Sequence, residues 1–149
     1  MKKLVLEYWA PLLVWILVIY IFSTDAFSSS ETSKVIIPAL GFFFPHLTLQ
    51  DLEFWHGVIR KLAHITEYFI LTLFVYRSLK HEQLDLLQAK LTTIMFVTLV
   101  AGFDELHQRF TVFRTPSPVD VAYDCFGAVC ALWLITTYET WRLRTRSVL

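Results

Sequence analysis

The sequence has little charge and little glycine for its length. Charged side chains make up 17% of its 149 residues, against about 25% in an ordinary soluble domain. There are only four glycines, whereas hydrophobic residues reach 56% and aromatic residues 16%. This composition is typical of a small integral membrane protein. Because the formal net charge is zero, electrostatics gives no support for nucleic-acid binding, and we expect no nucleic-acid partner.

Cysteine is also scarce, which excludes a disulfide scaffold. The two cysteines, Cys125 and Cys130, lie five residues apart on one expected helix. They point to different faces of that helix, so we expect free thiols. The sequence has no CxxC or Cys/His zinc motif, no Ser or Cys nucleophile elbow and no Gly-rich phosphate loop. A nucleophile would therefore have to be a histidine, a carboxylate or water.

Four apolar stretches are each long enough to cross a bilayer, for which roughly 20 helical residues suffice. They cover residues 4–23, 57–79, 90–108 and 118–138. We therefore predict an all-α fold, an integral membrane bundle of four transmembrane helices in a single domain of residues 1–149. Pro11 lies inside the first stretch and is expected to kink it.

The first stretch could instead be a cleaved signal peptide. Lys2 and Lys3 precede the apolar run, and Thr24-Asp25-Ala26 resembles a small-residue cleavage site. The run is long for a signal core, however, and Glu7 interrupts it. We therefore interpret it as an uncleaved span.

Positive charges are distributed unequally over the ends of the four stretches. One side collects Lys2, Lys3, Arg77, Lys80, Lys90, Arg142, Arg144 and Arg146. The other side has Lys34, Arg60, Lys61, Arg109 and Arg114. Because loops rich in Lys and Arg stay in the cytoplasm, we predict a multi-pass protein of the cell membrane with both termini cytoplasmic, including the basic tail 139–149.

The first extracytoplasmic loop, from about residue 24 to residue 56, is not simply polar. SSSETS, residues 28–33, is typical of a solvated turn. Residues 35–45 are apolar, broken by proline and glycine, and too short to cross. We expect this segment to lie in the interface or to re-enter the membrane. Thr48 can cap the helix that leads into the second span, and His56 is interpreted as an ordinary loop residue.

Polar side chains gather where the second span begins, the third ends and the fourth begins. In the predicted topology these three ends meet on the extracytoplasmic side. At about 100° per residue, Lys61, His64 and Tyr68 share a face of the second span. Asp104 and Gln108 lie one turn apart on the third. The full predicted pocket consists of Lys61, His64, Glu67, Tyr68, Asp104, Glu105, Gln108, Arg114, Asp120 and Asp124.

Some of these residues have simpler explanations. The cluster could be a structural ion-pair network. Glu105 and His107 could be solvated at a helix end. We interpret Arg60 as an interfacial anchor, and Gly127 and Ala128 as positions where helices pack closely.

Together these motifs resemble the VanZ-like family of small bacterial membrane proteins. The resemblance rests on KLAHITEY at 61–68, FDELHQRF at 103–110, FRTPSPVD at 113–120 and DVAYDCFG at 120–127, with FSTDAFSSS at 22–30 after the first span. It implies a multi-span fold and an association with resistance to glycopeptide antibiotics, chiefly teicoplanin. It does not imply an established reaction. The chain departs from the family in having Val112 to Arg114 in place of Pro-Gly-Arg, and Asp124 in place of the usual Asn.

The predicted pocket suits a polar-headed membrane lipid or a lipid-linked envelope precursor. Lys61 and Arg114 could hold a phosphate or carboxylate. His64 could form an acid–base pair with Asp104 or Asp120 for hydrolysis or transfer at a lipid phosphate. The predicted catalytic residues are therefore His64, Asp104 and Asp120. The predicted binding residues are Lys61, Glu67, Tyr68, Glu105, Gln108, Arg114 and Asp124.

Three alternatives stay open. The same pocket could bind a precursor or a lipoglycopeptide without chemistry. A small transporter would require a dimer, and a homo-oligomer is compatible with the sequence. Asp104, Asp120 and Asp124, or His64 with carboxylates, could hold a divalent ion. Because Lys61 would oppose a cation, we rank anion binding first, assign no metal and leave any cofactor unknown.

Overall fold

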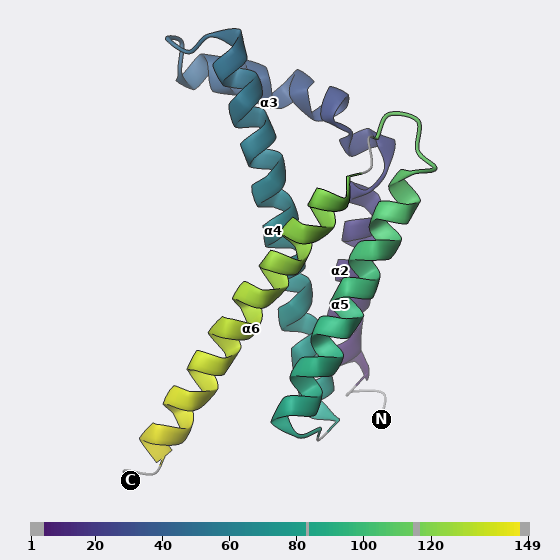
Figure 1. Cartoon of the computed structure of the whole chain (residues 1–149), viewed down its shortest axis with the longest axis vertical. Helices are drawn as coiled ribbons and strands as arrows, with labels where there is room; N and C mark the ends of the chain where they lie inside the picture. Colours follow the sequence, from purple (N-terminus) through teal and green to yellow (C-terminus); the bar gives the residue numbers. More distant parts are fainter. Residues whose placement is uncertain (1–4, 83, 115–116, 147–149) are drawn as a thin grey trace.

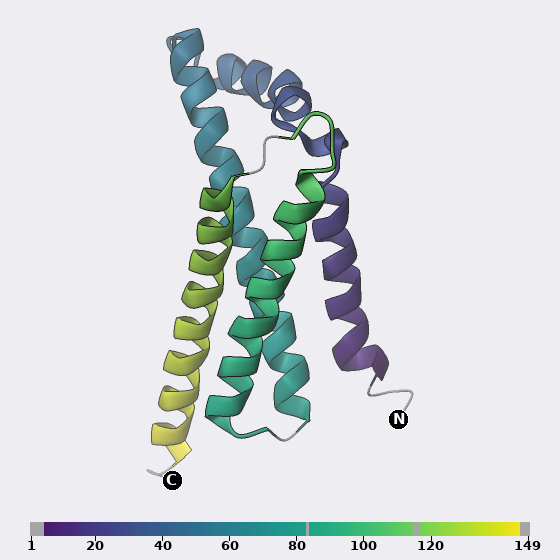
Figure 2. The same cartoon turned by 45° about the vertical axis from the view of Figure 1, so that its right-hand side comes forward.

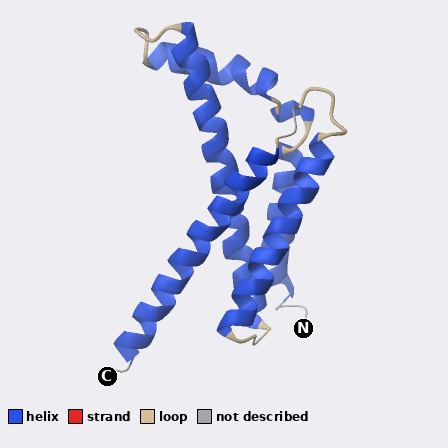
Figure 3. Cartoon of the chain, in the orientation of Figure 1, coloured by secondary structure: helices blue, strands red, loops and turns tan. Residues whose placement is uncertain are grey.

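A computed structural model describes residues 5–82, 84–114 and 117–146, and all its regular elements are helices (Figure 3). Their order along the chain is as follows: η1 (Val5–Trp9), α2 (Ala10–Phe22), η2 (Asp25–Phe27), α3 (Ser29–Phe43), α4 (Leu49–His81), α5 (Leu86–Gln108) and α6 (Pro118–Arg146). The first is a π-helix and η2 is a 3-10 helix. The predicted all-α class is confirmed.

The long helix α4 is central to the arrangement. It packs most extensively against α6, and also against α5 and α2. Figures 1 and 2 show α2, α4, α5 and α6 side by side, with α3 lying across one end. The first half of α4 extends past the other helices to reach α3 (Figure 1). The end of the bundle next to α3 therefore gathers chain segments that lie far apart in the sequence.

Two helix starts explain why the first loop is more ordered than predicted. Ser28 Oγ accepts a hydrogen bond from the N–H of Glu31 at 3.3 Å, so α3 begins at Ser29 and residues 28–33 are not a solvated turn. At α4, Thr48 and Asp51 form a reciprocal capping box, which confirms the predicted cap. Consequently His56 is a buried residue of α4 and not a loop residue.

Pro11 lies in the first turn of α2, where the π-helix η1 passes directly into the α-helix. Proline has no N–H to donate to the carbonyl of Glu7 four residues earlier, and that carbonyl accepts a hydrogen bond from Arg77 Nη2 at 3.3 Å. The kink at Pro11 stays a prediction.

Two of the described helices are long and apolar enough to cross a membrane, α5 and residues Pro118–Thr145 of α6. There are up to three if the bent pair Leu6–Phe22 and Asp25–Phe43, which turns by 72°, is one span. The charged and polar residues of α4 interrupt its apolar stretch, and α4 is not among them. Many large apolar side chains on the outer faces are exposed, as expected for helices in contact with lipid. The chain is a helical membrane protein.

Helices α4 and α6 are in close backbone contact at Gly127. A Cβ atom built there would lie 2.3 Å from the backbone oxygen of Ile65. Ala128 and Ala131, which follow on α6, are fully buried. The predicted close packing at Gly127 and Ala128 is confirmed, and it sets the register in which His64 of α4 faces α6.

Candidate functional site

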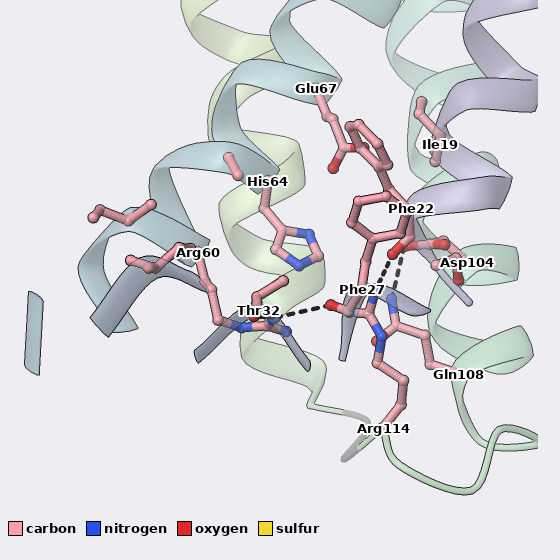
Figure 4. A pocket seen from close by; sticks show the side chains of 14 residues that line it. Ile19, Phe22, Phe27, Thr32, Arg60, His64, Glu67, Asp104, Gln108 and Arg114 are labelled. Atoms are coloured by element: carbon pink, nitrogen blue, oxygen red, sulfur yellow. Dashed lines mark hydrogen bonds between the residues drawn. The ribbon is translucent and has the colours of Figure 1, made fainter. Parts of the chain in front are cut away.

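A cavity of about 160 Å³ lies at the α3 end of the bundle (Figure 4). Five helices and the loop after α5 contribute to it. Its lining consists of Ile19, Phe22, Ser23, Phe27, Thr32, Ile36, Ile59, Arg60, Ala63, His64, Glu67, Asp104, Gln108 and Arg114. Apolar walls thus surround a group of ionisable side chains.

Helix α4 turns one face to this cavity, and Lys61 is not on it. Arg60, His64 and Glu67 follow one another at spacings of four and three residues, so they lie on one side of the helix. Lys61 lies on the other side of His64, about 60° around the helix axis. It is exposed, and its ammonium lies 5.3 Å from the ring centroid of Tyr123 on α6. Lys61 therefore does not line this cavity, whereas Arg60 does.

His64 faces a carboxylate of α6. Its Nδ1 lies 3.1 Å from Oδ1 of Asp124, and the two side chains are only 12% and 3% exposed. Such burial keeps the pair away from bulk water. We predicted Asp104 or Asp120 as the partner of His64. Asp120 lies one turn nearer the start of α6 and does not line the cavity, because the contact at Gly127 brings Asp124 level with His64.

The prediction that Asp104 and Gln108 are stacked on α5 is confirmed. Gln108 Nε2 donates a hydrogen bond to Oδ2 of Asp104 at 3.0 Å, and both residues line the cavity. Ligand atoms of Asp104, His64 and Asp124 all lie within 4.8 Å of one another. Three helices therefore bring these groups to one point, and the trio could hold a metal ion.

Two guanidinium groups lie on the side of the cavity that faces α3 and the loop after α5 (Figure 4). Arg60 Nη1 donates to the carbonyl of Phe27 at 3.1 Å and to Oγ1 of Thr32 at 3.2 Å. Arg114 donates to the carbonyls of Thr24, at 3.3 Å, and Phe22. Arg60 is thus a lining residue and not the interfacial anchor that we predicted. Burial lowers the pKa of Arg114 below its ordinary value, yet a guanidinium stays charged at neutral pH.

Thr32 connects Arg60 to His56. The Thr32 hydroxyl donates to the carbonyl of Ser28 at 2.8 Å, and His56 Nε2 lies 3.1 Å from the same hydroxyl oxygen. Arg60 Nη1 also donates to this oxygen, so Thr32 of α3 is joined to α4 at two positions.

The remaining predicted site residues lie around the cavity and do not line it. Tyr68 is fully buried, and no described residue pairs with its hydroxyl. Glu105 is 8% exposed with one oxygen unpartnered among the described residues, so it is not solvated at the helix end. Asp120 is half-buried in the first turn of α6. His107 bonds Ser23 Oγ at 3.0 Å through Nδ1 and packs on the ring of Tyr20.

The segment after α2 contributes residues that the sequence alone did not assign. Asp25 accepts hydrogen bonds from the N–H groups of Phe113 at 2.8 Å and Val112 at 3.3 Å. It thereby holds the loop that carries Arg114. Ser23, Phe27 and Thr32 line the cavity. Ser23 and Phe27 belong to FSTDAFSSS, which the sequence analysis used only as part of the family resemblance, and Thr32 lies outside that motif.

Removing the Asp25 carboxylate should loosen this loop. We expect Asp25→Ala to lower the free energy of unfolding by about 1–2 kcal/mol. This value is at the low end of the range for two hydrogen bonds to a charged acceptor, because Asp25 is partly exposed to solvent. Asp25→Asn, whose amide oxygen still accepts, should lose less. Thermal unfolding in detergent measures both. Equal unfolding midpoints for wild type and Asp25→Ala would refute this role.

Comparison with known proteins identifies the family of the chain. A family model described as VanZ/LLP1 matches residues 8–139, which include every lining residue of the cavity. No curated protein and no solved structure matches the chain. Since the match covers most of the sequence, the chain belongs to the VanZ/LLP1 family.

Proposed function

We propose that this protein binds the anionic headgroup of a membrane lipid, or of a lipid-linked cell-wall precursor, in the cavity between α2, α3, α4 and α5. The observation that carries the proposal is the convergence of Arg60 and Arg114 on the cavity. Their hydrogen bonds go to carbonyl and hydroxyl oxygens, and no described carboxylate forms a salt bridge with either. Two half-buried guanidinium groups without a direct counter-ion attract a phosphate or carboxylate.

The walls of the cavity favour a lipid over a soluble anion. Phe22, Phe27 and Ile59 line the cavity and are also partly exposed on the outside of the bundle. The rings of Phe22 and Phe27 lie 4.6 Å apart. An acyl chain can follow this apolar surface while the headgroup reaches the arginines, so one amphipathic ligand satisfies both parts.

The proposal includes a membrane topology. Helices α2 and α4 join α5 and α6 as spans, both termini are cytoplasmic, and the cavity faces the extracytoplasmic side. Support comes from the unequal distribution of Lys and Arg, and from the position of the cavity at the end of the bundle opposite η1 and the end of α6 (Figure 2). A site in this place meets outer-leaflet lipids and envelope precursors. A change in susceptibility to teicoplanin-type drugs would follow from altered access to those precursors.

A native mass spectrum of the protein in mild detergent tests the headgroup proposal. With phosphatidic acid and phosphatidylcholine added in equal amounts, we expect phosphatidic acid to stay bound at collision energies that remove phosphatidylcholine. Arginine pairs bind phosphate through charge-assisted hydrogen bonds that a zwitterionic headgroup satisfies less well. Equal retention of the two lipids would refute a charge-selective cavity.

Hydrolysis of the bound headgroup is a second candidate function, favoured by the contact between His64 and Asp124. Asp124 would orient the imidazole while a water oxygen attacks phosphorus and the ester P–O bond breaks. The imidazole would take the proton of the water and pass it to the leaving alkoxide, so that an alcohol and inorganic phosphate result. In the same spectra, conversion of phosphatidic acid to its dephosphorylated lipid favours hydrolysis. An unchanged lipid favours binding alone.

A further inference from the structure

Three carboxylates lie near the imidazole of His64. Glu67 and Asp104 line the cavity with His64, whereas Asp124 does not line it and faces His64 from α6. Asp104 accepts from Gln108, and Asp124 faces His64. Among the described residues no Lys or Arg forms a salt bridge with any of the three carboxylates. Their negative charge is therefore not neutralised by direct pairing with a cationic side chain.

Three of these groups lie close enough together to become ligands of one ion. His64 Nδ1 and Asp124 Oδ1 lie 3.1 Å apart, and the atoms that Asp104, Asp124 and His64 offer lie within 4.8 Å of one another. Two ligand atoms that are each about 2.1 Å from a metal lie roughly 3.0–3.6 Å apart. Small side-chain rotations would bring the third atom to the same distance.

Polar groups without partners beside these three residues also indicate a bound ligand. Tyr68 is fully buried, and its hydroxyl has no partner among the described residues. Tyr68 lies one turn after His64 on α4, so the two side chains are neighbours on the helix surface. Glu67 Oε1 is also buried without a described partner, on a residue that lines the cavity. A buried polar atom without a partner is unfavourable, so such an atom in a native protein indicates a missing partner such as a water, an ion or a ligand.

We propose that His64, Asp104 and Asp124 bind one divalent transition-metal ion, Zn²⁺ or Mn²⁺. Imidazole with carboxylates suits these ions better than Mg²⁺, which prefers an all-oxygen shell. Glu67 lines the same cavity and lies outside this group of three, so it would act as the partner of a metal-bound water. Two ionised aspartates and one divalent ion are neutral together, which reduces the cost of burying the charges.

The placement of Lys61 removes the objection that the sequence raised. Its ammonium lies over Tyr123 on the exposed side of α4 and does not line the cavity. The arginines lie on the side that faces α3 and the loop, with His64 and Glu67 deeper (Figure 4). The ion and the guanidinium groups would contact opposite sides of an anionic headgroup. Binding of the ion itself does not depend on the proposed function.

Titration of the purified protein with metal alone tests the proposal. The full chain in mild detergent, stripped with a chelator and without added lipid, is titrated with ZnCl₂ and, separately, with MnCl₂ by calorimetry. We expect one ion per chain and a rise in the unfolding midpoint. Asp104→Asn and Asp124→Asn keep side-chain size but remove an anionic ligand, and each should weaken binding roughly 100-fold or more. Glu31→Gln, which removes an exposed carboxylate paired with Lys34, should bind as wild type.

Several results would overturn the proposal. Wild-type protein that binds neither ion at micromolar concentration would do so, as would aspartate variants that bind as tightly as wild type. Circular dichroism and gel filtration identify variants that do not fold, and for those a His64→Gln variant takes their place. The visible spectrum with Co²⁺ gives a second readout. A thiolate charge-transfer band would assign Cys125 or Cys130 as a ligand and refute the proposed set, whereas weak d–d bands alone agree with it.

Discussion

Gly127→Ala should be among the most destabilising single substitutions in this chain. The added Cβ would lie 2.3 Å from the backbone oxygen of Ile65, and a backbone atom cannot rotate away as a side chain can. Helices α4 and α6 must then separate by most of an ångström, and overpacking of this kind costs about 1–3 kcal/mol. The 3.1 Å contact between His64 and Asp124 should lengthen as well, because these residues lie beside the same crossing. Thermal unfolding in detergent measures the loss.

A matched substitution on α5 separates this effect from helix propensity. Gly102 has no atom within 4 Å of a built Cβ. Because alanine favours a helix over glycine by up to about 1 kcal/mol, Gly102→Ala should leave the unfolding midpoint unchanged or raise it. If both variants unfolded at the wild-type temperature, the close contact between α4 and α6 would not be a constraint on the fold.

Arg114→Gln should weaken the binding of an anionic lipid by roughly tenfold or more. The glutamine can still donate hydrogen bonds, but the positive charge is lost. One charge-assisted hydrogen bond contributes about 1.5–3 kcal/mol, and each 1.4 kcal/mol is about tenfold in affinity. Arg114→Lys restores the charge without the planar fork, so its affinity should lie between those of wild type and Arg114→Gln. Titration with phosphatidic acid, followed by native mass spectrometry, gives the affinities.

Arg109→Gln provides the control for net charge. Arg109 caps the end of α5, is exposed and does not line the cavity. It should bind phosphatidic acid as wild type does. If Arg109→Gln lost as much affinity as Arg114→Gln, the lipid would respond to the overall charge of this end of the protein and not to the cavity.

The helices were predictable because long apolar stretches and cap residues act locally. The predicted stretch 90–108 lies within α5, and Thr48 caps α4 as its sequence indicates. The helical start of α3 was missed. A run of Ser and Thr can form either a turn or a helix N-cap. The hydrogen bond from the Glu31 N–H to Ser28 stabilises the helical alternative.

The sequence could predict which helix ends meet at the site, but it could not predict which side chains face the cavity. The polar residues of α4 and α5 were expected together, and His64 lies beside Asp104 as expected. Helical spacing places Arg60 and Lys61 on either side of His64, and the spacing alone cannot tell which side faces the cavity. Helix α4 packs against α6 with the side that carries Lys61 and Tyr68. The side that carries Arg60 and Glu67 therefore faces the cavity.

The hydrogen bonds of Asp25 and Arg114 have a consequence for the order in which the protein assembles. They join residues 22–25 to residues 112–114, partners that are 87 to 92 positions apart in the chain. During synthesis, residues 22–25 leave the ribosome well before residues 112–114 have been made. The cavity can therefore close only after α5 has been inserted in the membrane, so a growing chain holds its early polar residues without their partners until late in translation.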